Sequence, residues 1–124
     1  MNIGLSGTAG EKYACKMLIK KGYKVLSRNF QTRFGEIDIV CSDNDYIVFV
    51  EVKTRSQQYV GKGREAVTYS KQSKIIKAAV QYLQQNPIEL QPRFDVVEIT
   101  DANGTLSAEH IVNAFDAGGR YEFV

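Results

Sequence analysis

The stretch FGEIDIVCSDNDYIVFVEVKTR, residues 34–55, decides the fold of this chain because it holds two apolar runs separated by the polar segment 42–45. Side chains of a β-strand alternate between two faces. Alternate residues then form one apolar face in each run, namely Ile37, Ile39 and Cys41 in the first and Val48, Val50 and Val52 in the second. Two such runs joined by a short polar loop predict an antiparallel hairpin.

The opposite faces of the two runs carry charge, at Glu36, Asp38, Glu51 and Lys53. A loop of two or four residues pairs even positions of the first run with odd positions of the second, which places these four side chains together, whereas a loop of three or five would separate them. Opposing side chains lie roughly 5 Å apart, where two carboxylates repel by about 3 kcal/mol at an effective dielectric near 20. A divalent cation held by oxygen ligands would remove that repulsion. The alternative is a half-exposed sheet face with solvated acids and a salt bridge to Lys53.

Length and composition favour one globular domain over residues 1–124, since 124 residues that are 44% hydrophobic can build a core of their own. The net charge of +2, from 16 basic and 14 acidic residues, permits nucleic-acid binding without indicating it. Cys15 and Cys41 lack any metal-ligand spacing, so we expect two reduced, buried thiols. The sequence shows neither an apolar signal segment nor a membrane-spanning run, which predicts a cytoplasmic protein.

Periodicity and turn residues predict the elements around the hairpin. A helix is expected over 8–21, with Thr8 as N-cap and Gly22 ending it, and a second over 68–85, with Pro87 beyond its end. Strands are expected over 23–30, 94–100 and 109–112, the last two joined by a turn at Asn103-Gly104. This order predicts an α/β fold in which two main helices flank a mixed sheet of about five strands that contains an antiparallel meander.

Two polar residues lie on the apolar faces of the predicted helices. Glu11 precedes Ala14, Cys15 and Leu18 by helical spacing, so it either points at the sheet acids or returns to the Thr8 amide as part of a capping box. Gln72 lies on the line of the apolar residues of the second helix. It either hydrogen-bonds a water or phosphate of the site or satisfies backbone groups at the start of the helix.

Basic residues near the hairpin are candidates for phosphate contacts. Lys62 and Arg64 lie in a glycine-rich segment over 55–65 that predicts a loop, and its alternative is an ordinary solvated connection. Lys71, Lys74 and Lys77 step along one side of the second helix, where a solvated face is the alternative. His110, the only histidine, has no partner motif around it, so we expect an ordinary half-exposed position.

Asp38, twelve further residues and then Glu51-Val52-Lys53 reproduce the spacing of the PD-(D/E)xK nuclease superfamily, with Ile37 in place of the proline. Two acids suit a Mg²⁺ ion held against a scissile phosphate, and a lysine suits the orientation of the attacking water and the neutralisation of charge in the transition state. The segments NF, GEIDIV, VFVEVKTR, EAVT and RFDVV, together with the glycines before Glu11, resemble the YraN family of small bacterial proteins described as endonucleases.

The resemblance covers nearly the whole chain and extends to archaeal Holliday junction resolvases. It implies a restriction-endonuclease-like core, a DNA substrate that includes branched DNA, and Mg²⁺ or Mn²⁺ as cofactor. It also implies an active-site set of Glu11, Asp38, Glu51 and Lys53, with Glu36 adjacent and Gln72 in a supporting position. A homodimer is expected because paired cuts need paired sites. The alternative is a nuclease-fold module that binds nucleic acid or protein without cutting.

Overall fold

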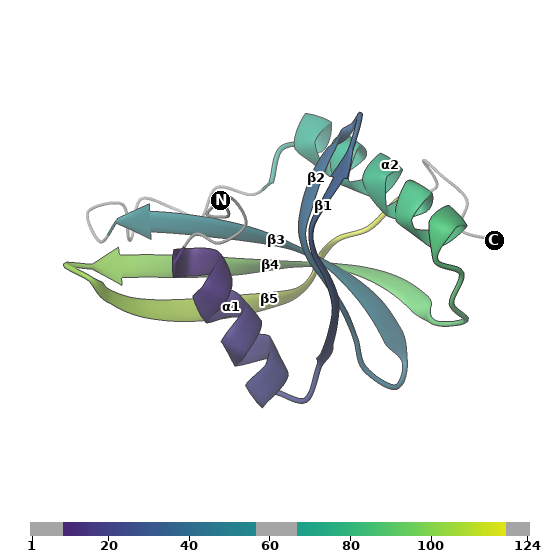
Figure 1. Ribbon diagram of the computed structural model, residues 1–124. Coiled ribbons are helices and arrows are strands. Elements are labelled where there is room, and N and C mark those ends of the chain that lie inside the picture. The colour runs from purple at the N-terminus through teal and green to yellow at the C-terminus, as the bar shows by residue number, and fades with distance from the viewer. Residues whose placement is uncertain (1–8, 57–66, 119–124) are drawn as a thin grey trace.

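The computed structural model describes residues 9–56 and 67–118, which form two helices and five strands (Figure 1). In chain order the elements are α1 (Ala9–Lys20), β1 (Lys24–Thr32), β2 (Gly35–Ser42), β3 (Tyr46–Ser56), α2 (Tyr69–Gln85), β4 (Gln91–Ala102) and β5 (Thr105–Phe115). The predicted α/β fold is confirmed. The last two strands are longer than predicted because their polar ends continue the ladder up to the turn at Asn103-Gly104, where both φ angles are positive.

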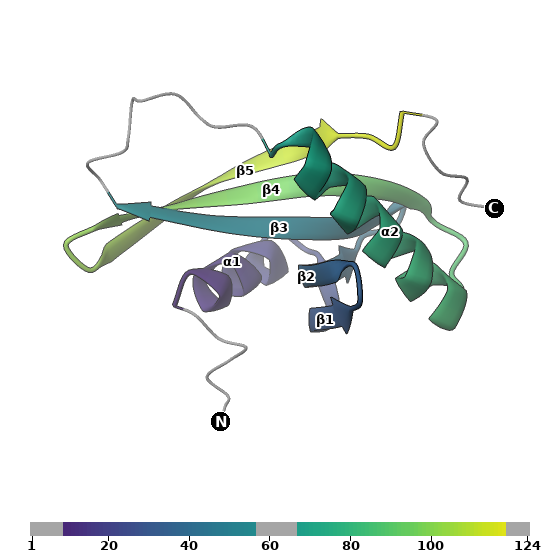
Figure 2. The same ribbon diagram turned by 90° about the horizontal axis from the view of Figure 1, so that it is seen from above.

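The five strands form one mixed sheet in the order β1-β2-β3-β4-β5. The first three form the predicted antiparallel meander, β3 and β4 are parallel, and β4 and β5 are antiparallel. A parallel pair needs a crossover connection, which here contains α2. In Figure 1, β1 and β2 run steeply across the middle of β3 and β4, and Figure 2 shows α1 and α2 on opposite sides of the sheet.

The hairpin of β2 and β3 has the register that brings the charges together. Ser42 pairs with Ile47 and Ile39 with Val50, so four residues lie between the paired strand ends. Asp43 shapes this loop because its Oδ1 accepts hydrogen bonds from the backbone N–H groups of Asp45 (2.8 Å) and Tyr46 (2.7 Å). Asp43 thus forms an Asx turn. The register confirms the predicted pairing of even positions in β2 with odd positions in β3.

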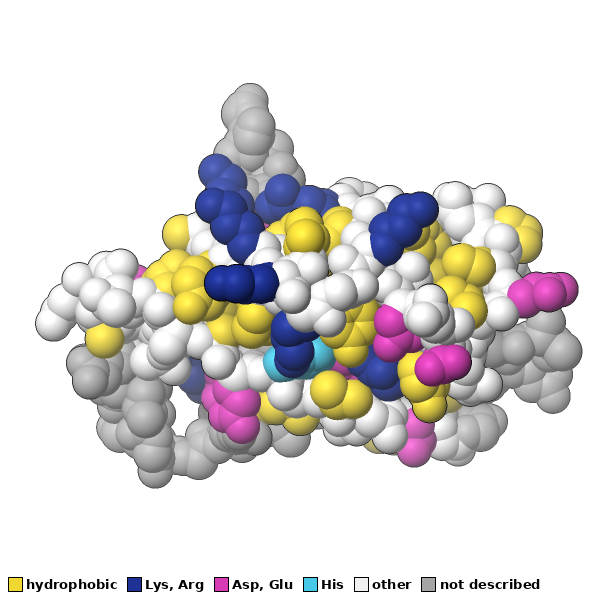
Figure 3. Space-filling model, turned by 90° about the horizontal axis from the view of Figure 1, so that it is seen from below, with side chains coloured by type: hydrophobic (Ala, Val, Ile, Leu, Met, Phe, Trp, Pro, Cys, Tyr) yellow, Lys and Arg dark blue, Asp and Glu magenta, His cyan; other side chains and the backbone are white. Residues whose placement is uncertain are grey.

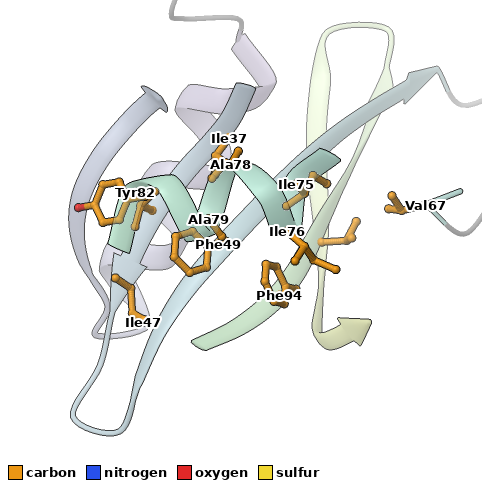
Figure 4. Packing of buried hydrophobic residues seen from close by; sticks show 12 residues of the cluster. Ile37, Ile47, Phe49, Val67, Ile75, Ile76, Ala78, Ala79, Tyr82 and Phe94 are labelled. Carbon is orange, nitrogen blue, oxygen red and sulfur yellow. The ribbon is translucent and has the colours of Figure 1, made fainter. Parts of the chain in front are cut away.

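Alternate residues of β3 pack into two cores, one on each face of the sheet. Ile47 and Phe49 lie beneath α2 with Phe94, in the cluster drawn in Figure 4. Val48 and Val50 lie beneath α1, in a cluster that also contains both cysteines. These faces agree with the alternation predicted for the second run, and both thiols are free and buried as predicted.

The prediction that Ile37, Ile39 and Cys41 share one face is wrong. Ile37 packs in the core beneath α2, whereas Ile39 and Cys41 pack in the core beneath α1. The pairing between β2 and β3 covers residues 39–42, and the part of β2 before Ile39 pairs only with β1. Because β2 leaves β3 at this point, the alternation of the first run does not continue through Asp38.

The helix ends follow the local signals. Gly22 has φ +100°, and the bonds from Gly22 N to Ile19 O and from Tyr23 N to Leu18 O form a Schellman motif at the end of α1. Thr68 caps α2 by accepting a hydrogen bond from Lys71 N at 3.1 Å. The other predicted cap, Thr8, lies outside the described residues.

Candidate active site

The candidate site lies where β2 and β3 separate. The last pair of their ladder is Ile39 with Val50, so Asp38 and Glu51 are the next residues on the two strands. Asp38 takes the place of the missing backbone pairing, because its Oδ2 accepts a hydrogen bond from Val52 N at 2.8 Å. The divergence of two strands thus creates the position that Asp38 fills.

The surroundings of Asp38 oppose its negative charge. Burial is the largest effect and raises its pKa from 3.8 to about 7, assisted by the negative charges of Glu51, Glu11 and Glu36. The hydrogen bond from Val52 acts in the opposite direction. The predicted acids are therefore close enough to interact, and Asp38 titrates near neutral pH.

Glu51 faces two cations. Burial raises its pKa, and the charges of Lys71 and Lys53 reduce that increase. Lys71 Nζ lies 3.8 Å from Glu51 Oε2, with the Lys71 side chain 46% exposed. Lys53, two residues further along β3, is half-buried. The structure thus brings the predicted lysine and a lysine of α2 to the same carboxylate.

Glu11 reaches the acids because α1 lies unusually close to β3 at its first turn. A Cβ atom on Gly10 would collide with Oγ1 of Thr54, so only glycine permits this approach. Glu11 Oε1 accepts a hydrogen bond from Asn29 Nδ2 at 3.1 Å. Of the two alternatives for Glu11, the structure shows the orientation towards the sheet acids, while the Thr8 partner of the capping box lies outside the described residues.

Asn29 is the residue of this site that sequence reasoning missed. It lies on β1 between Arg28 and Phe30, whose partners are Ile39 and Ile37, so it faces Asp38 across the pair of strands. Its backbone is left-handed, with φ 51°, which asparagine tolerates better than most residues. Its Nδ2 donates to Glu11 and also to Glu36 Oε2 at 2.6 Å. An asparagine in a strand, where this residue type is depleted, was the available signal.

The donor set of the site suits a hard cation. Asn29 Oδ1 is buried and has no hydrogen-bond partner among the described residues, although a buried amide oxygen normally has one. Carboxylate and amide oxygens are the ligands that Mg²⁺ takes in proteins. No group of three or more His, Cys, Asp or Glu side chains in residues 9–56 and 67–118 is arranged to hold a metal by itself. The residues therefore fit an ion that takes one or two carboxylates and fills its other positions with water and substrate oxygens.

The remaining predicted residues lie around the acids or outside the described structure. Gln72 Nε2 donates to Val67 O at 2.8 Å, which is the contact expected from its backbone-satisfying alternative, and its supporting role stays a prediction. Lys74 lies on α2 beside the end of the β1–β2 hairpin, because a Cβ atom added to Gly35 would lie 3.9 Å from the Cβ of Lys74. Lys62 and Arg64 belong to the segment 57–66, which lies outside the described residues.

A second polar cluster, beneath the other end of α1, was also missed. Asp95 is 1% exposed and accepts hydrogen bonds at Oδ1 from Arg93 Nε (2.9 Å) and from Asn113 N (2.9 Å). At Oδ2 it accepts from Arg93 Nη2 (2.8 Å) and pairs with His110 Nε2 (2.7 Å). Burial acts to raise the pKa of Asp95, but the bonds from His110, Arg93 and Asn113 bring it below its usual value. A charge inside the apolar run 94–97 was the signal that could have revealed it.

His110 belongs to this cluster. The residue is half-buried as predicted, but its side chain is only 3% exposed, and both ring nitrogens have partners. Nδ1 lies 2.7 Å from Lys21 Nζ, and an ammonium can only donate, so Nε2 carries the hydrogen that bonds Asp95. Figure 3 shows the histidine, in cyan, largely covered by a dark-blue Lys or Arg side chain.

The mixed sheet, the two covering helices and the acids at the divergence of two strands define a protein with a restriction-endonuclease-like core. The chain belongs to the uncharacterised protein family UPF0102, whose model matches residues 10–99. It is similar to a UPF0102 protein of Syntrophomonas wolfei, with 49% identity over 110 residues that cover 88% of this chain and 96% of the relative. A UPF0102 protein of Geobacter metallireducens is 47% identical over 111 residues, covering 89% and 91% of the two chains.

Neither α1 nor α2 has the length and apolar character needed to cross a membrane.

Proposed function

We propose that this protein is a metal-dependent endonuclease that hydrolyses phosphodiester bonds in DNA, including branched DNA. The observation that carries the proposal is the position of Asp38, which is buried beside Glu51, Glu11 and Glu36 and has its pKa raised to about 7. A protein gains no stability from charges placed in this way, and perturbed acids that converge at one place are typical of catalytic sites.

In this proposal Asp38 and Glu51 are the ligands of Mg²⁺, or of Mn²⁺, and Glu11 is an outer ligand or general base. The ion supplies charge stabilisation at the scissile phosphate and lowers the pKa of water. Asp38 would have to give up its proton to act as a ligand, since its pKa, raised to about 7, leaves it partly protonated at neutral pH. Gln72 and Glu36 support these residues from α2 and β2.

Lys53 would orient the attacking water and offset the negative charge that develops at the phosphate. The water oxygen forms a bond to phosphorus, and the bond from phosphorus to the leaving ester oxygen breaks. The proton of the water passes to Glu11 or to solvent, and the leaving oxygen takes a proton from solvent and ends as a hydroxyl group. Lys62, Arg64, Lys71 and Lys74 are proposed to contact flanking phosphates.

The proposed DNA substrate also bears on the oligomeric state of the protein and on its location in the cell. Branched DNA is cut symmetrically when two sites act together, so we include a homodimer in the proposal. Action on DNA by a chain with two free, buried cysteines is consistent with the reducing cytoplasm.

The test is cleavage of labelled linear, flapped and four-way DNA by the purified protein with Mg²⁺ or Mn²⁺. We expect cleavage that is lost in Asp38→Ala and Lys53→Gln and retained in Lys12→Gln, a control lysine on the exposed side of α1. Equal cleavage by Asp38→Ala and the parent, or no cleavage of any of these substrates, would contradict the proposal.

The second candidate is a nuclease-fold module that binds nucleic acid or protein without cutting. It is favoured by the absence, among the described residues, of a ready-made group of three metal ligands. The small net charge of +2 and the lack of a base-reading motif also favour it. Tight, metal-independent DNA binding that survives Glu51→Ala, without cleavage by the parent, would establish this alternative.

A further inference from the structure

A row of four cations leads away from the candidate site. It consists of Lys71, Lys74 and Lys77 on α2 and Arg33 at the turn between β1 and β2, and is called the cationic row below. Lys71 begins the row at Glu51, with 3.8 Å between Nζ and Oε2. Figure 1 shows the end of the β1–β2 hairpin beside α2, and contacts of Lys74 with Gly35 and of Lys77 with Phe34 join the two elements.

Phe34 joins the hairpin to the helix. The Lys77 ammonium lies 5.5 Å from the centre of its ring, and the Arg33 guanidinium lies 4.9 Å from it. Such cation–π contacts hold both cations close to one half-buried aromatic ring. The hairpin end is therefore fastened to the middle of α2, and the distance between Arg33 and the lysines is set by packing.

The charge of this surface is unbalanced. α2 contains three lysines and no acid in seventeen residues, and its first turn holds Lys71 where the helix dipole favours a negative charge. Residues three positions apart are neighbours on a helix surface, so the three lysines also repel one another. An anionic partner along the row would remove both costs.

The geometry points to the sugar–phosphate backbone of DNA, and we infer that the cationic row holds the strand next to the scissile phosphate without reading bases. This inference rests on the proposed function. Lys71 and Lys77 are separated by about 9 Å along the helix axis. One strand of a duplex carries a phosphate about every 3.4 Å of axis, so the lysines span about two or three phosphates. The start of the row at Glu51 makes these phosphates neighbours of the bond to be cut.

The test compares two triple variants that remove the same charge. One is Arg33→Gln/Lys74→Gln/Lys77→Gln, which leaves Lys71 beside Glu51 unchanged. The matched control is Lys12→Gln/Lys16→Gln/Lys20→Gln on the exposed side of α1, the helix on the opposite face of the sheet. Binding of a fluorescein-labelled duplex is measured by anisotropy in EDTA from about 50 to 200 mM salt, the range over which phosphate contacts are strongly screened.

The slope of log K against log[salt] changes by about 0.9 for each phosphate contact, so the row variant should lose nearly three units of slope. Over this fourfold change in salt, the binding constant of the row variant should therefore fall about 40-fold less than that of the parent. The control should keep most of the parent slope, and a second duplex of different sequence should give the same values. The charge-retaining variant Lys74→Arg/Lys77→Arg should keep the parent slope. This result would show that the row variant loses slope because its charges are missing and not because it fails to fold.

An unchanged slope in the row variant, an equal loss in the α1 control, or no DNA binding by the parent in EDTA would each overturn the inference. The proposed function fails on a different measurement, cleavage with Mg²⁺ or Mn²⁺. If the parent binds DNA with the expected slope but never cuts it, the inference about the cationic row stands and the proposed endonuclease function is contradicted.

Discussion

Asp38 and Asp95 are two aspartates of the sheet with opposite electrostatic surroundings. Asp95 accepts hydrogen bonds from Arg93, His110 and the backbone of Asn113, and its pKa is lowered. Asp38 accepts a hydrogen bond from Val52 and lies among other acids that, together with burial, raise its pKa to about 7. The first arrangement stabilises the fold, whereas the second costs stability that only a ligand of positive charge would recover.

The largest expected effect is on the Asp95 side of the comparison. Asp95→Ala leaves the Arg93 guanidinium buried without its carboxylate and removes the partner of His110. Removal of one member of a buried, hydrogen-bonded ion pair costs about 3–5 kcal/mol. Urea unfolding followed by circular dichroism should show this loss. A loss below about 1 kcal/mol would mean that the cluster contributes little to folding.

Asp38→Asn should have the opposite sign. At pH 8 the ionised Asp38 opposes folding, and a shift of about three pKa units corresponds to at most about 4 kcal/mol. The asparagine keeps an oxygen for the bond from Val52 and removes the charge. We expect a higher melting temperature in EDTA, together with loss of Mg²⁺ binding in calorimetry. A variant that is less stable than the parent at pH 8 would show that repulsion between the acids does not lower the stability of the parent.

The pH dependence of stability should separate the two aspartates. Between about pH 4 and 7 folded Asp38 holds a proton that the unfolded chain has released, so its contribution to stability falls as pH rises through this window. Asp95 has a lowered pKa, so its contribution is present above the ordinary carboxyl range and is lost as pH falls. Melting temperatures from pH 3 to 9 in EDTA should show a decline towards neutral pH that Asp38→Asn abolishes. If Asp38→Asn leaves this decline unchanged, the titrating group is another one.

The smallest expected effect concerns the amide that bridges two acids. Asn29→Ala removes the bonds to Glu11 and Glu36 and should cost about 1 kcal/mol in EDTA. Mg²⁺ should stabilise this variant less than the parent, because the variant also lacks the buried amide oxygen that suits the ion. The control is Asn113→Ala, which replaces another left-handed asparagine (φ 55°) that bonds Asp95 through its backbone. Equal losses in both variants would assign the effect to backbone strain.

Local patterns in the sequence predicted the elements well because their causes are local. Thr68 caps α2, Gly22 ends α1, and the loop after Ser42 has the length that makes Asp38 and Glu51 the next residues beyond the last pair of the ladder. Ile37 was assigned to the wrong face because alternation holds only while a strand keeps its partner, and β2 leaves β3 at Asp38. Asn29 was missed because its role depends on a left-handed backbone and on acids from two other elements.

The sequence by itself determined the strand and helix pattern, the presence of the acid-bearing hairpin and the spacing of Asp38, Glu51 and Lys53, since caps, turn residues and side-chain alternation act over a few residues. Only the tertiary structure decided which charges meet. It brought Glu11 to Asn29 across 18 positions and Arg93 to Tyr23 across 70. It also gave two aspartates opposite electrostatic roles, because the free energy of a buried charge depends on the dipoles and charges that the whole fold places around it.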